Sequence, residues 1–371
     1  MNLNLKTKKE YQAQLDLKIS YIKNLFSDVK VIENLDIYTS EINYFRMRAE
    51  FRIFHDYENN KVYHSMFDKS INKLVLVDTF PIASKLINSL MQEVMSFVNN
   101  NESLLREKLF QVDYLTTLSG EVLITLIYHK KLSELWIDKA NSLKEHLIYM
   151  GYNLNIIGRA KNTKIELDKD YVLESLSTDD GIFKYKQIEN SFTQPNALVN
   201  TKMINWAKNC LGSKENNDLL ELYCGNGNFT LPLSKSFNNV LATEISSSSI
   251  KCAEFNILQN NLSNIKVVKM SAEDLIDAFL ETRVYRRLNG LDLKSYNFST
   301  VFVDPPRAGI DLKTLSFIKQ YDSILYISCN PKTLRENYDF LKDKFEVKKI
   351  AIFDQFAYSD HIEVGMYLCK K

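Results

Sequence analysis

The feature that most constrains the fold is a repeated alternation of short apolar segments with helix-length segments after residue 200. The apolar segments have the length and composition of buried strands and lie at 219–223, 240–243, 265–270, 300–303 and 324–327. Repeated βα units of this kind predict a doubly wound, mostly parallel α/β sheet. Two last strands, 347–353 and 362–369, are separated by about eight residues, too few for a helical crossover. We therefore expect them to form an antiparallel hairpin at the sheet edge.

The first half of the chain has a different pattern, which predicts an α+β domain. Apolar residues recur every three or four positions, as in helices, over 11–26, 82–98 and 133–149. Strand pairs are predicted for 45–53 with 62–67 and for 110–118 with 121–128, and further strands to residue 188. We therefore divide the chain into an N-terminal domain, 1–188, and a C-terminal domain, 189–371.

Composition excludes several classes of protein. Hydrophobic residues make up 45% of the 371 residues, enough for a sizeable core. No apolar run approaches the roughly 18 residues that a membrane span needs, and the N-terminus lacks a signal-type core, so we expect a cytoplasmic protein without a membrane partner. The five cysteines all follow residue 200 without C-x-x-C spacing, which argues against disulfides and zinc ribbons. The net charge is only +1, so a nucleic acid would have to bind a local basic face.

A glycine turn follows the first strand of the second half. The segment Cys224–Asn228 contains two glycines at the carboxyl end of that strand, where open α/β sheets bind ligands and where small residues let the backbone approach a nucleoside. Thr230 occupies the third position of G-x-G-x-x-G, which disfavours a dinucleotide. Glu244 ends the next strand, 17 residues after Gly227, and this spacing suits a carboxylate that binds ribose hydroxyls. Alternatively, Glu244 caps the helix that begins near Ser246.

Three later segments place reactive side chains at strand ends. In Asp304–Arg307, two prolines hold the chain extended, so that the Asp304 carboxylate projects into the crevice. Cys329 follows the next strand and is a candidate nucleophile, the alternative being a small core residue. The final hairpin connection brings Asp360, His361 and Glu363 towards the same face and supplies a candidate general base.

Several segments carry a resemblance to a known family. They are SFTQPN (191–196), LLELYCGNGNF (219–229), VFVDPPRAG (301–309), YISCNP (326–331), DQFAYSDHIEVG (354–365), RMRAEFRIFHD (46–56), KLFQVDYLTTLSG (108–120) and IGRAKNTKIELD (157–168). Together they resemble the RNA uracil-C5 methyltransferases, most closely the bacterial tRNA enzymes that methylate the T loop. The resemblance covers nearly the whole chain. It implies a class I, Rossmann-like S-adenosylmethionine-dependent methyltransferase domain and an N-terminal RNA-recognition domain.

The same resemblance implies residue roles, transferred motif by motif. Cys329 would be the nucleophile and Glu363 the base. The S-adenosylmethionine site would include Gln194, Tyr223, Gly225, Asn228, Glu244 and Asp304. The RNA would contact Phe110, His129, Phe192 and Arg307. Neither a metal nor an iron–sulfur cluster is expected. The family commonly has proline at Ala357 and histidine at Asp360, so this chain departs from the pattern at two positions that leave Glu363 in register.

The implied chemistry suits these residue types. The C5 carbon of uracil is too weak a nucleophile to take a methyl group directly, but attack of a thiolate on C6 makes C5 carbanion-like. After methyl transfer, Glu363 would remove the C5 proton and elimination would release Cys329. A uridine in a folded loop must first be extruded, at a cost of a few kcal/mol.

The expected partner is the T-arm stem-loop of tRNA, with uridine 54 as the target, and other RNAs with a T-like loop remain open. Candidate phosphate contacts, each of which could instead be a solvated charge, are Arg46, Arg48, Arg52, Arg159, Lys161, Lys164, Arg283, Arg286 and Arg287. We expect a monomer.

Three alternatives compete with this interpretation. A ribosomal-RNA uracil-C5 methyltransferase would use the same chemistry, but those relatives often hold an iron–sulfur cluster on four cysteines, and none precedes Cys210 here. A non-catalytic RNA-binding or RNA-folding protein could retain the same scaffold, although Cys329 and Glu363 are both present. An amino-group methyltransferase of the D-P-P-Y type needs no cysteine and carries an aromatic residue where Arg307 stands.

Overall fold

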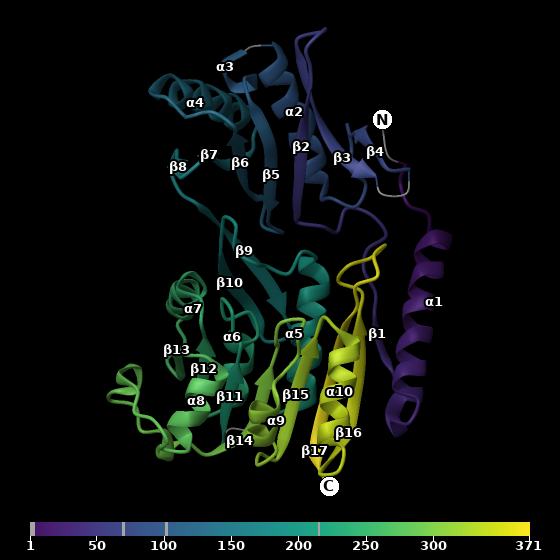
Figure 1. The fold of residues 1–371 in the computed structure, drawn as a ribbon, viewed down its shortest axis with the longest axis vertical. Helices are drawn as coiled ribbons and strands as arrows, with labels where there is room; N and C mark the ends of the chain where they lie inside the picture. The colour runs from purple at the N-terminus through teal and green to yellow at the C-terminus, as the bar shows by residue number, and fades with distance from the viewer. Residues whose placement is uncertain (1–3, 69–70, 101–102, 214–215) are drawn as a thin grey trace. The chain divides into compact units, whose positions relative to one another are not determined.

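The computed structural model describes residues 4–68, 71–100, 103–213 and 216–371, and these form two compact units (Figure 1). The first unit contains the chain up to residue 8 with 41–175 and 187–197, and the second contains 9–40, 176–186 and 198–371. A boundary at residue 188 would assign 9–40 and 176–186 to the N-terminal domain. The structure groups both segments with the second unit.

The second unit is built on an eight-stranded sheet in the order β1-β16-β17-β15-β14-β11-β12-β13. Its strands are β1 (Asp36–Tyr38), β11 (Asp218–Leu222), β12 (Val240–Glu244), β13 (Ile265–Lys269), β14 (Phe298–Val303), β15 (Ser323–Ser328), β16 (Phe345–Phe353) and β17 (Glu363–Lys370). Strands β11 to β15 pair in parallel, and β17 runs antiparallel to both β15 and β16. The predicted α/β class and the C-terminal antiparallel hairpin are confirmed.

The predicted position of that hairpin at the sheet edge is wrong. Strand β1, only three residues long, pairs in parallel with β16 and occupies the edge instead. Because Asp36–Tyr38 lies more than 300 residues before its partner and has no strand-length apolar run, no local pattern announces this pairing. The N-terminal segment therefore completes the sheet of the second unit.

The order of the strands determines where a ligand can bind. The chain runs from β11 outward through β12 and β13, and then returns to β14 on the other side of β11. Leu222 at the end of β11 is paired with Thr243 of β12 and with Val303 of β14. The next residues, Tyr223, Glu244 and Asp304, therefore meet at the point where the strand order reverses, which is the usual ligand crevice of such sheets.

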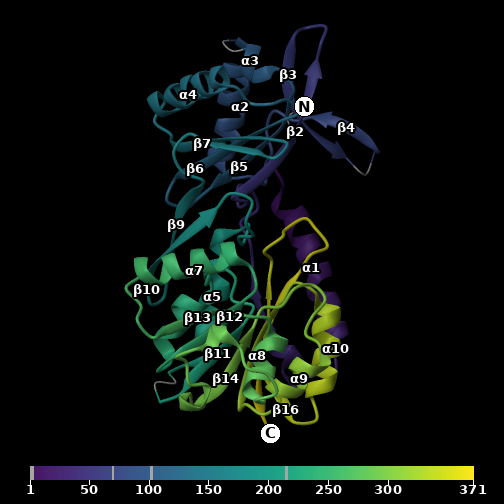
Figure 2. The same cartoon turned by 60° about the vertical axis from the view of Figure 1, so that its left-hand side comes forward.

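Helices and short 3₁₀ turns accompany this sheet. They are α1 (Lys8–Leu25), η1 (Lys30–Asn34), α5 (Ala197–Leu211), α6 (Thr230–Leu233), η2 (Ser234–Ser236), α7 (Ser247–Gln259), α8 (Ala272–Phe279), η3 (Arg286–Leu288), η4 (Leu293–Ser295), α9 (Leu312–Ile318) and α10 (Pro331–Leu341). Several begin at a side-chain cap directly after a strand: Ser246 accepts from the Ser249 N–H and Asn330 from that of Lys332. Figure 2 shows α7 and α10 on opposite sides of the second unit.

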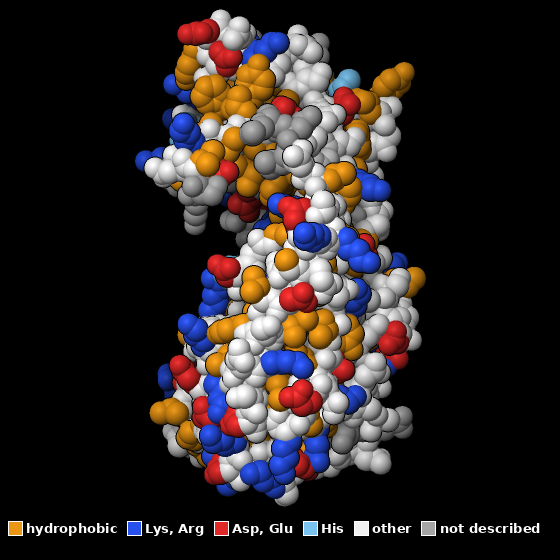
Figure 3. All heavy atoms as spheres, turned by 90° about the vertical axis from the view of Figure 1, so that its right-hand side faces the viewer, with side chains coloured by type: hydrophobic (Ala, Val, Ile, Leu, Met, Phe, Trp, Pro, Cys, Tyr) orange, Lys and Arg blue, Asp and Glu red, His pale blue; other side chains and the backbone are white. Residues whose placement is uncertain are grey.

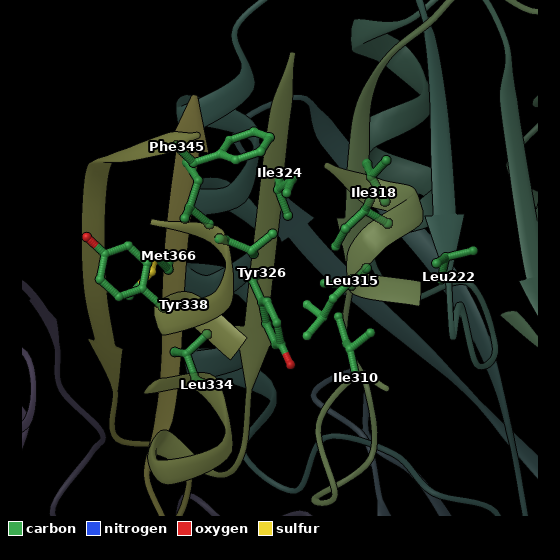
Figure 4. Close-up of a cluster of buried hydrophobic side chains, with 14 of the residues drawn as sticks. Leu222, Ile310, Leu315, Ile318, Ile324, Tyr326, Leu334, Tyr338, Phe345 and Met366 are labelled. Carbon is green, nitrogen blue, oxygen red and sulfur yellow. The ribbon is translucent and has the colours of Figure 1, made fainter. Parts of the chain in front are cut away.

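The core of the second unit is densely apolar behind the strand ends. Figure 4 shows Ile324 and Tyr326 of β15 between side chains of α9 and α10, in the cluster that also holds Leu315 and Leu334. Within this cluster the Tyr326 hydroxyl donates to the side-chain oxygen of Asn337, 2.8 Å away. Strand β15 therefore packs against both α9 and α10. This packing fixes the position of Cys329, the residue that follows the strand.

The first unit is built on a seven-stranded sheet in the order β4-β3-β2-β5-β6-β7-β8. Its elements are β2 (Arg48–Asp56), β3 (Lys61–Asp68), β4 (Lys73–Leu76), α2 (Lys85–Asn100), α3 (Ser103–Arg106), β5 (Leu109–Thr116), β6 (Glu121–Tyr128), α4 (Glu134–Tyr149), β7 (Asn153–Ala160) and β8 (Thr163–Glu166). Helix α4 connects the parallel strands β6 and β7, and its Trp136 packs so closely on β7 that a side chain at Gly158 would overlap the ring. This unit is α+β, as predicted. A separate two-stranded sheet, β9 (Tyr171–Thr178) and β10 (Gly181–Ile188), is divided between the units.

Candidate active site

The antiparallel pairing of β15 with β17 brings together the two residues expected to react. Ser328, the last residue of β15, is paired with Val364. Cys329 follows Ser328 directly, and Glu363, the first residue of β17, directly precedes Val364, so continuing the register by one step places the two side chains across from each other. Glu363 also contributes to the raised pKa of the Cys329 thiol, as a nearby acid does. Cys329 is half-buried, whereas only 3% of the Glu363 surface is exposed. A thiol and a carboxyl therefore lie opposite each other at the carboxyl edge of the parallel strands.

Burial raises the pKa of each group in this cluster, and neighbouring acids add to the effect at Glu363 and Cys329. Burial raises the pKa of Asp304 to about 7. It also raises the pKa of Glu363 well above its usual range, with Asp304 adding to the effect and Arg307 opposing it. For Cys329, burial is again the main cause of a raised thiol pKa, followed by Glu363 and Asp304, while Arg307 again opposes. A carboxylate with a raised pKa is a stronger base once ionised, as a proton acceptor in catalysis requires.

The turn after β14 is tied to the start of α10. The side chain of Asn330 donates to the carbonyl oxygen of Arg307 at 2.9 Å, and its oxygen caps α10. Asn330 directly follows Cys329, so one residue positions both the thiol and the arginine. The exposed Arg307 guanidinium lies 3.2 Å from Nε2 of His361.

The loop that leads into Glu363 is held by α1. Lys18 Nζ lies 2.7 Å from Oδ1 of Asp354 and also donates to the carbonyl of Phe356 at 3.0 Å, and Gln14 donates to the other Asp354 oxygen at 2.9 Å. Lys18 and Asp354 are 6% and 0% exposed. This buried ion pair fixes the loop between β16 and β17, and our sequence interpretation missed it because its partners are 336 residues apart.

The glycine turn after β11 has the conformation that close approach of a ligand requires. Gly225 has φ +56°, and a Cβ there would meet nothing within 4 Å, so the turn leaves open space at this residue. At Gly227, with φ +86°, a Cβ would instead meet Leu231 at 2.6 Å, so this glycine serves packing. Tyr223 also has a positive φ, 65°.

Both carboxylate oxygens of Glu244 accept hydrogen bonds from backbone N–H groups. One carboxylate oxygen accepts the N–H groups of Ile245 and Ser246, and the other accepts the N–H of Gly225 at 3.1 Å. Since Ser246 itself caps α7, Glu244 is not the cap residue. It joins the glycine turn to the end of β12, with its carboxylate at the crevice.

Two further polar residues lie in β11 or in the glycine turn that follows it, Glu221 and Asn228. Asn228 exchanges side-chain hydrogen bonds of 2.7 and 2.9 Å with Asn200 of α5, which fixes its amide. Glu221, within β11, is 1% exposed, and its Oε2 has no hydrogen-bond partner among the described residues. Burial raises the pKa of Glu221 to about 8. We gave Glu221 no role from sequence, although a carboxylate inside the apolar run 219–222 was a usable signal.

The remaining expected site residues lie in the first unit. Phe110 and His129 stack with ring centroids 3.9 Å apart, and the Arg52 guanidinium lies 3.9 Å from the Phe110 centroid. Phe192 is 73% exposed, and Gln194 follows on the same segment. Some candidate phosphate contacts have internal partners: Arg48 donates to the carbonyl of Ser191, Arg159 pairs with Glu189, and Lys164 pairs with Asp170.

Cys329 lies in the wall of a hollow of about 830 Å³ within the second unit. Its lining comes from α1, from the start of α10 and from the loop before Glu363. In the described part of the chain, no three His, Cys, Asp or Glu side chains are grouped as metal ligands, and no helix is long and apolar enough to cross a membrane.

Comparisons with known proteins agree with this geometry. Residues 10–371 match the family described as tRNA (uracil-5-)-methyltransferase. A tRNA/tmRNA (uracil-C(5))-methyltransferase of Vibrio parahaemolyticus is 48% identical over 97% of both chains, and one of Shewanella woodyi is 48% identical over the full length of both. The crystal structure of Pyrococcus abyssi tRNA (uracil-54, C5)-methyltransferase with S-adenosyl-L-homocysteine is 20% identical. It has a TM-score of 0.72 over 96% of this chain and 83% of that one, which shows a shared fold.

The buried ion pair yields a stability prediction. Replacing Lys18 by methionine leaves the Asp354 carboxylate buried without its cation, so the free energy of unfolding should fall by about 3–5 kcal/mol. Denaturant unfolding measures this. Lys342→Met, which removes an exposed pair with Asp339, is the matched control and should cost less than about 1 kcal/mol. Adding Asp354→Asn to Lys18→Met should restore part of the lost free energy of unfolding. A double variant no more stable than Lys18→Met alone would contradict the explanation.

The raised pKa of Glu363 yields a pH prediction. The folded state holds the Glu363 proton more tightly than the unfolded chain, so this group's stabilising effect is complete below about pH 4.5 and is lost as pH rises towards the folded pKa. Glu363→Gln should therefore become more stable than the wild type between pH 5 and 8, by roughly 1.4 kcal/mol per unit of pKa shift. Urea unfolding at several pH values measures the difference. Asp360→Asn, in the exposed part of the same loop, should show the same dependence of unfolding free energy on pH as the wild type. If the effect of Glu363→Gln on stability does not change with pH, the raised pKa of Glu363 is refuted.

Proposed function

Because the chain belongs to the tRNA (uracil-5-)-methyltransferase family, we propose that it transfers a methyl group from S-adenosylmethionine to C5 of uridine 54 in the T loop of tRNA. The observation that carries the proposal is the antiparallel pairing of Ser328 with Val364, because continuing it by one residue brings Cys329 opposite Glu363. A nucleophile and a base on adjacent strands can act on neighbouring ring carbons of one uracil, C6 and C5. Since relatives are named for tmRNA as well as tRNA, RNAs with a T-like loop are proposed as further substrates.

The covalent step begins at Cys329. Its thiol gives its proton to solvent and the thiolate sulfur bonds to C6, which moves the electron pair of the C5–C6 double bond onto C5 and O4. That pair would then bond to the sulfonium methyl group of S-adenosylmethionine, and the broken C–S bond would leave S-adenosylhomocysteine. Arg307 is the nearby group that opposes the raised thiol pKa, so it favours the thiolate. Glu363 in its ionised form accepts the proton from the methylated C5, and the electron pair of that C–H bond reforms the C5–C6 double bond as the sulfur leaves.

The residues at the reversal point fit S-adenosylmethionine. The open space at Gly225 admits a nucleoside, and Glu244 presents a carboxylate to ribose hydroxyls. Tyr223, Asn228 and Asp304 complete the site on the second unit, and Gln194 is proposed to join it. When bound, S-adenosylmethionine supplies the electrophilic methyl group.

The first unit is proposed to recognise the folded-out loop. The stacked Phe110 and His129 rings offer a flat surface, and base stacking on such side chains contributes roughly 1–3 kcal/mol per base. This energy can offset the few kcal/mol needed to extrude the target uridine. The exposed Phe192 is proposed to contact the target base.

Substrate and chemistry can be tested with one RNA. The protein should label a T-arm stem-loop transcript from S-adenosylmethionine at C5 of the loop uridine, without added metal. Label confined to ribosomal RNA would remove the tRNA assignment and favour the ribosomal alternative. RNA binding without any label would favour a non-catalytic RNA-folding protein.

Two variants separate the proposed catalytic roles. Cys329→Ala should bind the RNA yet neither methylate nor trap it, because no bond to C6 can form. Glu363→Gln should attack and alkylate, then stall as a covalent protein–RNA complex that carries the methyl group and survives denaturing electrophoresis. Asp360→Asn is the matched control and should turn over normally. Methylation by Cys329→Ala would rule out covalent catalysis, and normal turnover by Glu363→Gln would assign the base to another residue.

A further inference from the structure

Helix α1 has an apolar stripe that its own packing does not explain. Tyr11, Leu15 and Ile22 are buried in the second unit, as a core-facing stripe should be. Leu17 and Tyr21, four residues apart on another face, are 73% and 38% exposed. Single exposed apolar residues are common, but these two line the same hollow as Cys329. Figure 3 shows the side of the second unit that carries α1, with hydrophobic side chains among basic and acidic ones.

The hollow also has cationic side chains in its lining. Lys18 lies on α1 itself, Arg307 and Lys332 come from later segments, and Asp360 is the one acid of the lining among the described residues. Lys18 is already paired with Asp354. In the described part of the chain, neither Arg307 nor Lys332 forms an ion pair with a carboxylate, and both side chains are exposed. The mouth of the hollow therefore has an excess of positive charge that favours an anionic ligand.

The size of the hollow and its position beside Cys329 indicate which anionic ligand it binds. At about 830 Å³ the hollow is at the upper end of the range for ligand pockets, so it can hold more than one uracil ring. Cys329 forms part of its wall, and a uridine that reaches Cys329 stays joined to the nucleotides on both sides. Each of these nucleotides brings one negative phosphate and one flat base.

We propose that this hollow binds a nucleotide that adjoins the target uridine, with its base packed against Tyr21 and Leu17 and its phosphate paired with Lys332. The inference rests on the proposed function and adds a binding subsite on α1 and α10 of the second unit. Stacking and a phosphate contact tolerate any base. The subsite therefore strengthens RNA binding without selecting a sequence.

Binding and kinetics test the subsite. Tyr21→Ala and Lys332→Ala should each raise the KM for a T-arm transcript roughly tenfold, with kcat and the KM for S-adenosylmethionine unchanged. Lys332→Ala should also reduce the slope of log affinity against log salt by about 1, as loss of one phosphate contact does. The matched controls are Tyr149→Ala, an exposed tyrosine of the first unit, and Lys344→Ala, just beyond the other end of α10; both should equal the wild type.

Cross-linking gives a readout that does not need turnover. With 4-thiouridine placed on one side of the target and then on the other, at least one transcript should cross-link to the α1 peptide that contains Tyr21. If the wild type methylates the transcript but Tyr21→Ala and Lys332→Ala keep its KM and no α1 peptide is cross-linked, the subsite is refuted and the proposed function stands. If the wild type neither methylates nor cross-links the transcript, the proposed function fails and the subsite fails with it.

Discussion

The arrangement of the site depends on one antiparallel strand in an otherwise largely parallel sheet. Strand β17 enters between β15 and β16 in the opposite direction, so its first residue lies at the edge where the parallel strands end. In an all-parallel sheet, only carboxyl ends would meet there. The reversal puts Glu363, the start of one strand, opposite Cys329, just past the end of its neighbour.

The site also depends on the burial of its two carboxyl groups, Glu363 and Asp304. Glu363 is buried and Asp304 is partly buried, and burial raises the pKa of both carboxyl groups, with Arg307 opposing the rise at Glu363. Such a cluster costs stability when ionised, because charges in a poorly solvated site are unfavourable. The buried ion pair of Lys18 with Asp354 fixes the loop between β16 and β17 that leads into Glu363. This contact holds Glu363 in place. Groups kept in unfavourable protonation states are common at sites where proton transfer occurs.

Much of this arrangement could be predicted from local patterns. The βα repeat predicted the sheet, and strand ends predicted where Asp304 and Cys329 emerge, because both patterns depend on neighbouring residues. The position of the hairpin was wrong because the three residues of β1 carry no signal for their distant partner. The hydrogen bond between Glu244 and Gly225 and the lack of a partner for Oε2 of Glu221 among the described residues depend on side-chain directions, which periodicity does not encode.

By itself, the sequence determined the α/β class, the order of the strands along the chain and the residue types at each strand end, since periodicity and turn chemistry are local properties. Tertiary structure alone decided that α1 and β1 complete the second unit, that Lys18 is buried against Asp354, and that the exposed stripe of Leu17 and Tyr21 faces the hollow beside Cys329. These features join segments more than 300 residues apart. Such contacts arise only when the whole chain buries its apolar surface, so no window of sequence contains them.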